Sequence, residues 1–115
     1  MKLVILESPY GNDDPEVVAV NVSYARACMH DCLVNHNEAP YASHLLYTQP
    51  GVLRDGEPEE RRIGIEAGMC WGAEAEATVV YTDRGLSVGM EEGIARAAEA
   101  GREVVFRKLK NWGTP

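Results

Sequence analysis

Short apolar runs separated by longer helical segments are the feature that most constrains how this chain can fold. The runs span Lys2–Leu6, Ala77–Thr82 and Glu103–Arg107, and a fourth short strand is expected over Ala39–Ala42. Segments with helical periodicity span 16–34, 59–75 and 90–100. Strands that alternate with helices indicate an α/β fold. We therefore expect a single-domain, doubly wound and mainly parallel sheet of 4–5 strands in a flavodoxin- or Rossmann-like three-layer sandwich.

Turn and helix signals refine this pattern. Asp13 and Asp14 precede Pro15, which is typical of an N-cap followed by proline in the first helical turn. In the segment 16–34, helical spacing predicts a buried stripe that includes Val17, Val20, Tyr24, Ala27, Cys28 and Leu33. In the segment 59–75, one face carries Ile63, Ala67, Cys70 and Trp71, and the glycines at 64, 68 and 72 favour close packing on the sheet. Between these helices Ser43–Pro58 is rich in Pro and Gly and is expected to be a loop with a function.

The length of 115 residues suits one domain, which we place at residues 1–108, with an irregular C-terminal tail at 109–115. The tail segment Asn111–Pro115 could either reach a neighbouring subunit or form a disordered end.

Charge and cysteine content exclude several classes of protein. The chain carries 18 acidic residues against 11 Lys and Arg, a net charge of −7, which argues against binding to a nucleic acid polymer. No apolar run approaches the ~20 residues of a membrane span, and no secretory signal is evident, so a cytoplasmic protein is expected. Three cysteines without an export signal fit reduced thiols. Cys28 and Cys32 with His30 and His36 could form a metal site, but two thiols on a helix face is the favoured interpretation, and no metal is predicted.

In doubly wound sheets, ligands bind at the carboxyl ends of the strands. That rule selects three segments: Glu7–Gly11 after the first strand, the long loop near His44, and the turn Asp83–Gly89. Backbone amides at a helix N-terminus could hold an anion or a sugar hydroxyl, and Tyr10 could bind a ligand oxygen. A plain strand-to-helix turn with Tyr10 on the surface is an equal alternative.

Three further side chains have both a catalytic and a structural interpretation. Glu91, in the first turn of a helix, could be a nucleophile, although a simple complement to the helix dipole is favoured on spacing alone. Glu66 could reach the site as a second carboxylate, or lie on a solvated helix face, which is favoured. His44 could contact a ligand or act as an acid, and closing a loop by hydrogen bonds is somewhat favoured.

Taken in order along the chain, these segments resemble the nucleoside 2-deoxyribosyltransferase-like superfamily. The resemblance covers most of residues 2–107, and it rests on Ser8–Gly11 after an apolar strand, Asn21–Val22 and Tyr24–Arg26 on the helix that follows, Pro40–Tyr47, the strand Thr78–Tyr81 and the helix start Gly89–Gly93. The strongest piece is the Gly-aromatic/Met-Glu-x-Gly pattern at that helix start. The chain is most similar to small members found in phage and bacterial genomes.

The resemblance implies an enzyme that cleaves or exchanges an N-glycosidic bond. Glu91 matches the family's nucleophile, Tyr10 matches the region that supports it, and Glu66 is the nearest candidate for a sugar-binding acid. The remaining expected substrate-binding residues are Glu7, Ser8, Pro9, His44, Asp83, Gly85, Ser87, Gly89 and Met90. Glu7 departs from the small residue usual in the family, and it could repel a phosphate or serve as a second catalytic acid.

The first functional hypothesis is an N-glycosidase or 2-deoxyribosyltransferase-like enzyme. It would act through a glutamate nucleophile on a (deoxy)nucleoside or its 5′-monophosphate, without a cofactor, as a homodimer or larger assembly. The alternative is a non-catalytic protein that sequesters or senses a nucleotide on the same fold. A third interpretation is an interaction protein that uses its acidic surface.

Overall fold

The computed structural model describes residues 1–113 and contains a four-stranded, all-parallel sheet. The strands are β1 (Lys2–Glu7), β2 (Glu38–Tyr41), β3 (Ala77–Tyr81) and β4 (Glu103–Arg107), and the helices are α1 (Pro15–Asn35), α2 (Ser43–Leu46), α3 (Pro58–Gly72) and α4 (Val88–Glu99). The expected α/β class and strand number are confirmed. The expected loop Ser43–Pro58 contains the one-turn helix α2, and the remaining boundaries differ by a few residues.

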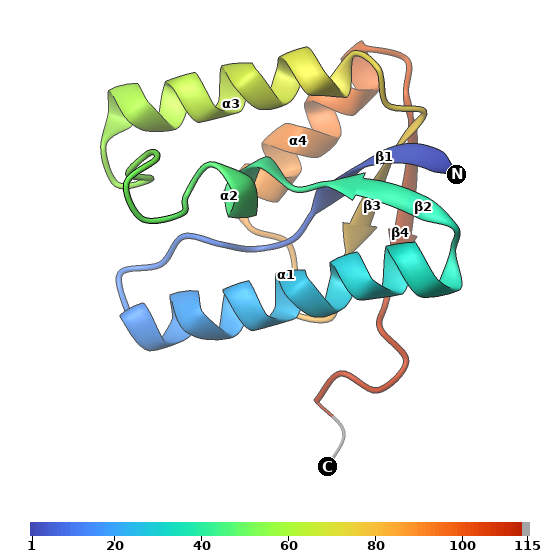
Figure 1. Cartoon of the computed structure of the whole chain (residues 1–115), viewed down its shortest axis with the longest axis horizontal. Coiled ribbons are helices and arrows are strands. Elements are labelled where there is room, and N and C mark those ends of the chain that lie inside the picture. The colour runs from blue at the N-terminus through green and yellow to red at the C-terminus, as the bar shows by residue number, and fades with distance from the viewer. Residues whose placement is uncertain (114–115) are drawn as a thin grey trace.

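The sheet order β2-β1-β3-β4 places β1 and β3 in the centre. Lys2 lies opposite Glu38, Val4 opposite Ala77, and Ala77 opposite Glu103. Helix α1 covers one face of the sheet, α3 and α4 cover the other, and α2 lies near the carboxyl ends of the strands (Figure 1). All three layers of the expected sandwich are therefore present, and the chain reverses its direction of winding after β2, as a doubly wound sheet requires.

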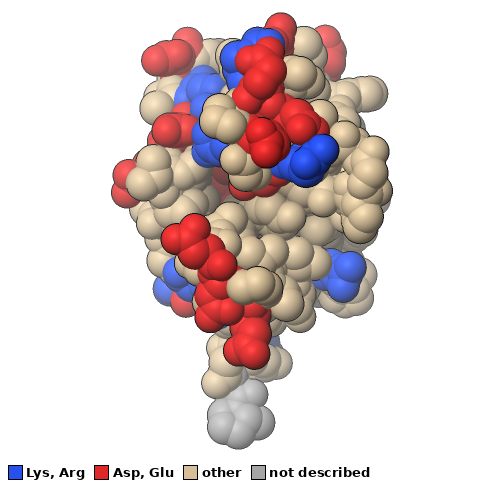
Figure 2. All heavy atoms as spheres, turned by 90° about the vertical axis from the view of Figure 1, so that its left-hand side faces the viewer, with Lys and Arg blue, Asp and Glu red and all other residues tan. Residues whose placement is uncertain are grey.

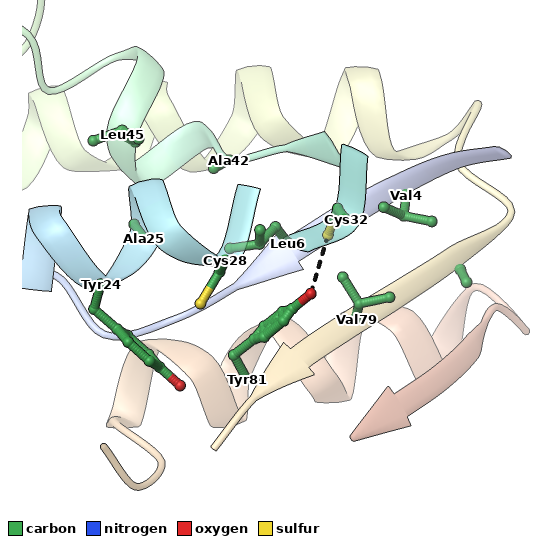
Figure 3. Close-up of a cluster of buried hydrophobic side chains, with 11 residues drawn as sticks. Val4, Leu6, Tyr24, Ala25, Cys28, Cys32, Ala42, Leu45, Val79 and Tyr81 are labelled. Atoms are coloured by element: carbon green, nitrogen blue, oxygen red, sulfur yellow. Dashed lines mark hydrogen bonds between the residues drawn. The ribbon is translucent and has the colours of Figure 1, made fainter. Parts of the chain in front are cut away.

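The main core lies between α1 and the sheet. Tyr24, Cys28 and Cys32 pack from α1 against Val4, Leu6, Val79 and Tyr81 (Figure 3). The buried stripe of α1 runs through Asn21, Tyr24, Ala25, Cys28 and Cys32. The predicted stripe was therefore wrong at Val20 and Leu33, which are 41% and 45% exposed. Because Cys28 and Cys32 are core residues, they act as small hydrophobic groups.

Helix α3 packs through glycines rather than through its apolar side chains. A Cβ at Gly68 would meet the Ser43 side chain at 3.0 Å, and one at Gly72 would meet Ile5 at 3.6 Å. Only Gly72 therefore rests on the sheet, whereas Gly68 rests on α2. Ile63 and Trp71, placed by the sequence on a packing face, are 43% and 59% exposed. The small residues bring α3 close to the carboxyl edge of the sheet.

A buried ion pair links the two edge strands beneath α1. Arg107 at the end of β4 donates to both carboxylate oxygens of Glu38 at the start of β2, at 2.8 and 3.1 Å. The Arg107 side chain is 14% exposed and that of Glu38 is 9% exposed. Tyr81 lies within the same cluster and donates to Asp31. Burial opposes ionisation of Glu38, but the adjacent guanidinium outweighs it and lowers the pKa of that carboxyl.

The segment after β4 has no helix or strand over 108–113. Leu109 and Trp112 nevertheless pack against the core, and the Trp112 ring lies 4.8 Å from the Tyr24 ring between centroids. Trp112 thus contacts its own domain, and Thr114 and Pro115 lie outside the described residues. Among residues 1–113, no helix is long and apolar enough to cross a membrane.

Candidate functional site

A cavity of about 450 Å³ opens at the carboxyl ends of the strands. Each of the segments selected by the strand-end rule contributes to it, through Glu7 at the end of β1, His44 on α2 and Ser87 before α4. Helix α3 adds Arg61 and Gly64, which the sequence analysis had not assigned to the site. The size suits a ligand such as a nucleoside, since small-molecule sites span roughly 300–1,000 Å³.

Glu7 is the most perturbed carboxyl group in this cavity. It is the last residue of β1, and its side chain lies against Gly93 of α4, where a Cβ would overlap the carboxylate. Burial raises the pKa of Glu7 from 4.5 to about 7, against the opposing attraction of Arg96 and Arg102. A carboxyl group with a pKa near 7 can donate a proton at neutral pH and accept it back.

Ser8, Tyr10 and His44 form a polar wall beside Glu7. The Ser8 hydroxyl lies 2.8 Å from Nε2 of His44, and the Tyr10 ring meets the His44 ring edge-on. Burial lowers the pKa of His44 to about 4, so the imidazole is neutral at neutral pH. A neutral imidazole can donate or accept a hydrogen bond, but it adds no positive charge. The sequence-based interpretations of His44 as a ligand contact and as a loop-closing residue are therefore compatible.

Asn21 holds the Tyr10 segment in place. Its amide donates to the Tyr10 carbonyl at 2.9 Å and accepts from Nε of Arg84 at 3.0 Å. This buried Asn joins the loop after β1 to the loop after β3. The family resemblance included Asn21 but gave it no role in the site, although an Asn in the middle of an otherwise apolar helical stripe was a visible signal.

The start of α4 brings Ser87, Gly89 and Met90 to the cavity. Ser87 caps the helix by accepting from the Met90 amide at 3.2 Å. Because Met90 and Gly93 face the sheet, Glu91 points away from it: Glu91 is exposed and lies outside the cavity lining. Glu92, one residue further on, lines the cavity. To reach a ligand there, Glu91 needs a change in the first turn of α4.

The other predicted site residues lie elsewhere. Pro9, Glu66, Asp83 and Gly85 do not line the cavity. Glu66 pairs with Arg62 on the exposed side of α3 at 2.9 Å. Asp83 accepts from the Tyr24 hydroxyl at 2.6 Å and from the Leu109 amide at 3.0 Å. The hydrogen bonds of Asp83 therefore anchor the tail and the end of β3.

Acidic groups outnumber basic groups around the cavity. Four carboxyl residues line it, Glu7, Asp55, Glu60 and Glu92, together with two arginines, Arg61 and Arg96. Arg61 already lies 3.9 Å from both Asp55 and Glu92. On the face where α1 and α3 begin, acidic side chains form two groups separated by a hollow (Figure 2). In the described chain no group of three or more His, Cys, Asp or Glu is arranged to hold a metal ion.

Comparison with known proteins agrees with this architecture. A solved 2-deoxyribosyltransferase from the psychrotolerant bacterium Bacillus psychrosaccharolyticus is similar, with a TM-score of 0.61 and 17% identity. The match covers 92% of this chain and 72% of that one, so the two proteins share an α/β fold. The family model described as "Domain of unknown function (DUF7768)" matches residues 2–107, and the chain belongs to that family. No curated protein matches significantly.

Proposed function

We propose that this protein is a nucleoside-handling enzyme that cleaves or exchanges the N-glycosidic bond of a (deoxy)nucleoside or its 5′-monophosphate. The observation that carries the proposal is Glu7, a carboxyl group with a pKa of about 7 that faces a cavity of nucleoside size. The shared fold with a 2-deoxyribosyltransferase supports it. In this proposal Glu7 is the second catalytic acid.

The proposed chemistry uses two carboxyl groups with different roles. Protonated Glu7 donates its proton to the departing base, while an ionised glutamate attacks the anomeric carbon and forms a glycosyl-enzyme. Water or a second base then attacks the same carbon and releases the sugar from the glutamate. Ser8, Tyr10 and His44 supply neutral hydrogen-bonding groups for the sugar hydroxyls.

The nucleophile in this proposal lies in the first turns of α4. The motif match points to Glu91, whereas the position of the cavity favours Glu92, which lines it without any movement. Both residues lie near the positive end of the helix dipole, which stabilises an ionised carboxylate. Glu91→Gln and Glu92→Gln are therefore a matched pair that separates the two assignments.

A non-catalytic nucleotide-binding protein is the second candidate. The position of Glu91 outside the cavity lining favours this alternative, because the motif marks that residue as the nucleophile. Such a protein would keep its affinity for the ligand in each glutamate variant, because binding does not require a nucleophile.

A product screen tests the proposal. The protein is incubated with a panel of nucleosides and 5′-monophosphates, and free base is sought by chromatography and mass spectrometry. We expect base release from one substrate class, reduced roughly 10²–10⁴-fold in Glu7→Gln because a general acid is lost. The screen is repeated with acceptor bases to detect exchange.

The two remaining variants identify the nucleophile. Loss of base release in Glu92→Gln with activity kept in Glu91→Gln assigns the attack to Glu92, and the reverse result assigns it to Glu91. If the protein binds a ligand but shows neither base release nor exchange in any assay, the enzyme proposal is rejected in favour of the non-catalytic nucleotide-binding protein.

A further inference from the structure

A second, smaller cavity of about 60 Å³ lies behind Glu7, on the sheet face covered by α3 and α4. It shares Glu7, Ser43, Ile65 and Arg96 with the larger cavity. Glu7 therefore borders both spaces. Its carboxyl group can be approached by the substrate from one cavity and by a second molecule from the other.

The Tyr41 side chain enters this smaller cavity from β2. Tyr41 lies opposite Ile5 in the parallel register, and Glu7 is two residues beyond Ile5, so all three side chains lie on the same sheet face. The Tyr41 hydroxyl is buried, and although the Tyr47 side chain lies beside it, no described residue meets it with ordinary hydrogen-bond geometry. Because burying a hydroxyl without a hydrogen-bond partner costs free energy, we expect a bound molecule to pair with the Tyr41 hydroxyl.

The size and lining of the smaller cavity identify that ligand. A water molecule needs roughly 10–15 Å³ of such volume and two to four polar partners. The Tyr41 hydroxyl, the Glu7 carboxyl group and Ser43 supply such partners. Arg102, also in the lining, is already bound to Thr78 at 3.0 Å and to the Gly72 carbonyl at 2.7 Å. The cavity thus has the polarity for water and room for only a few molecules.

We propose that the smaller cavity is a water site in which the Tyr41 hydroxyl and the Glu7 carboxylate bind the same ordered water molecule. Resting on the proposed function, the second part of the inference is that this water completes the reaction. The enzyme is then a hydrolase, and exchange with a second base is the minor outcome.

In the hydrolytic step, Glu7, the ordered water and the nucleophilic glutamate account for every proton and bond that changes. After Glu7 has given its proton to the departing base, it is a carboxylate and accepts a proton from the water. The two cavities adjoin at Glu7, and the water moves from the smaller cavity to the sugar in the larger one. Its oxygen forms a bond to the anomeric carbon as the bond from that carbon to the nucleophilic glutamate breaks. The products are the free sugar, protonated Glu7 and the regenerated glutamate carboxylate. Tyr41 holds the water and is a positioning residue.

High-resolution crystal structures of the full chain without ligand test the water site. We expect an ordered water within hydrogen-bond distance of Tyr41 Oη and of Glu7 in the wild type, and its loss in Tyr41→Phe. The control for this readout is Tyr10→Phe, since Tyr10 lines only the larger cavity and its ring packs on His44 rather than on Tyr41. The ordered water should persist in crystals of this control variant. Wild-type crystals without a water that contacts both groups would overturn the proposal.

Product partition tests the reaction step. The wild type is supplied with substrate and excess acceptor base, and free sugar is compared with the exchanged nucleoside. We expect mostly free sugar, and in Tyr41→Phe about a tenfold fall in hydrolysis relative to exchange, the effect of one lost hydrogen bond. Predominant exchange in the wild type overturns the hydrolytic step. An ordered water in crystals of a protein that cleaves nothing refutes the proposed function while the water site stands.

Discussion

At the scale of single residues, Glu7 and His44 are shifted in opposite directions by the same cause. Burial penalises whichever form is charged, so it raises the pKa of Glu7 to about 7 and lowers that of His44 to about 4. Between those values both groups are uncharged. The wall of the cavity then offers a proton donor and a neutral imidazole, the arrangement that the proposed departure of a base requires.

These shifts predict opposite trends of stability with pH. Folded Glu7 keeps a proton between pH 4.5 and about 7 that the unfolded chain releases, so its contribution to the free energy of unfolding falls as pH rises. Folded His44 lacks a proton between about pH 4 and 6.5 that the unfolded chain binds, so its contribution falls as pH falls. The two trends oppose each other in the wild type.

Denaturant unfolding between about pH 4 and 7 separates the contributions of Glu7 and His44 to the free energy of unfolding. Relative to wild type, Glu7→Gln should gain stability as pH rises from 4.5 to 7, by up to about 1.4 kcal/mol per pH unit. His44→Gln should lose stability relative to wild type as pH rises from 4 to 6.5. Parallel pH curves for either variant and the wild type would contradict the corresponding assignment.

At the scale of elements, the approach of α4 to β1 depends on Gly93. Any larger residue there meets the Glu7 carboxyl group, which has to leave its place. The Met-Glu-x-Gly pattern therefore has a structural component, because its glycine allows the carboxyl group of the first strand to lie beneath the helix.

Gly93→Ala should displace Glu7 and lower base release at least tenfold, although alanine favours an isolated helix by about 1 kcal/mol. The measurement is base release together with thermal unfolding. Gly72→Ala is the control for stability, since its Cβ meets Ile5 at an ordinary 3.6 Å. Full activity in Gly93→Ala would show that the position of the Glu7 carboxyl group against α4 does not matter for the reaction.

The elements also show how far sequence reasoning reaches. The strands β1, β3 and β4 were predictable because each is a short apolar run, and the strand-end rule located the segments around the cavity. Which of Glu91 and Glu92 lines the cavity was not predictable, because successive helical residues are rotated by about 100° and the phase of α4 is set by Met90 and Gly93 packing on the sheet. Arg61 and Arg96 were missed because long side chains on helices join a site through tertiary packing alone.

At the scale of the whole molecule, the cavity opens on an acidic face. The net charge of −7 is reinforced locally by the carboxyl groups at the starts of α1 and α3 (Figure 2). The arginines of the lining lie among carboxylates, so a phosphate group would meet a negative potential.

This potential predicts a preference among ligands. An unphosphorylated nucleoside should bind more tightly than its own 5′-monophosphate at low ionic strength, by about tenfold, and added salt should narrow the gap through screening. Titration calorimetry on both ligands at two salt concentrations measures this. Tighter binding of the monophosphate would show that local donors, such as the N-terminus of α4, outweigh the acidic surroundings.

The ion pair between Glu38 and Arg107 has a consequence for how the protein is made. The two residues are 69 positions apart, so at about 5–20 residues per second a ribosome adds Arg107 roughly 3–14 s after Glu38. Throughout that interval the Glu38 carboxylate lacks the Arg107 guanidinium, so its free energy is lowest when it is exposed to water. We therefore expect that the nascent chain does not bury a sheet of only its first three strands, and that the domain folds in one step once β4 has been made.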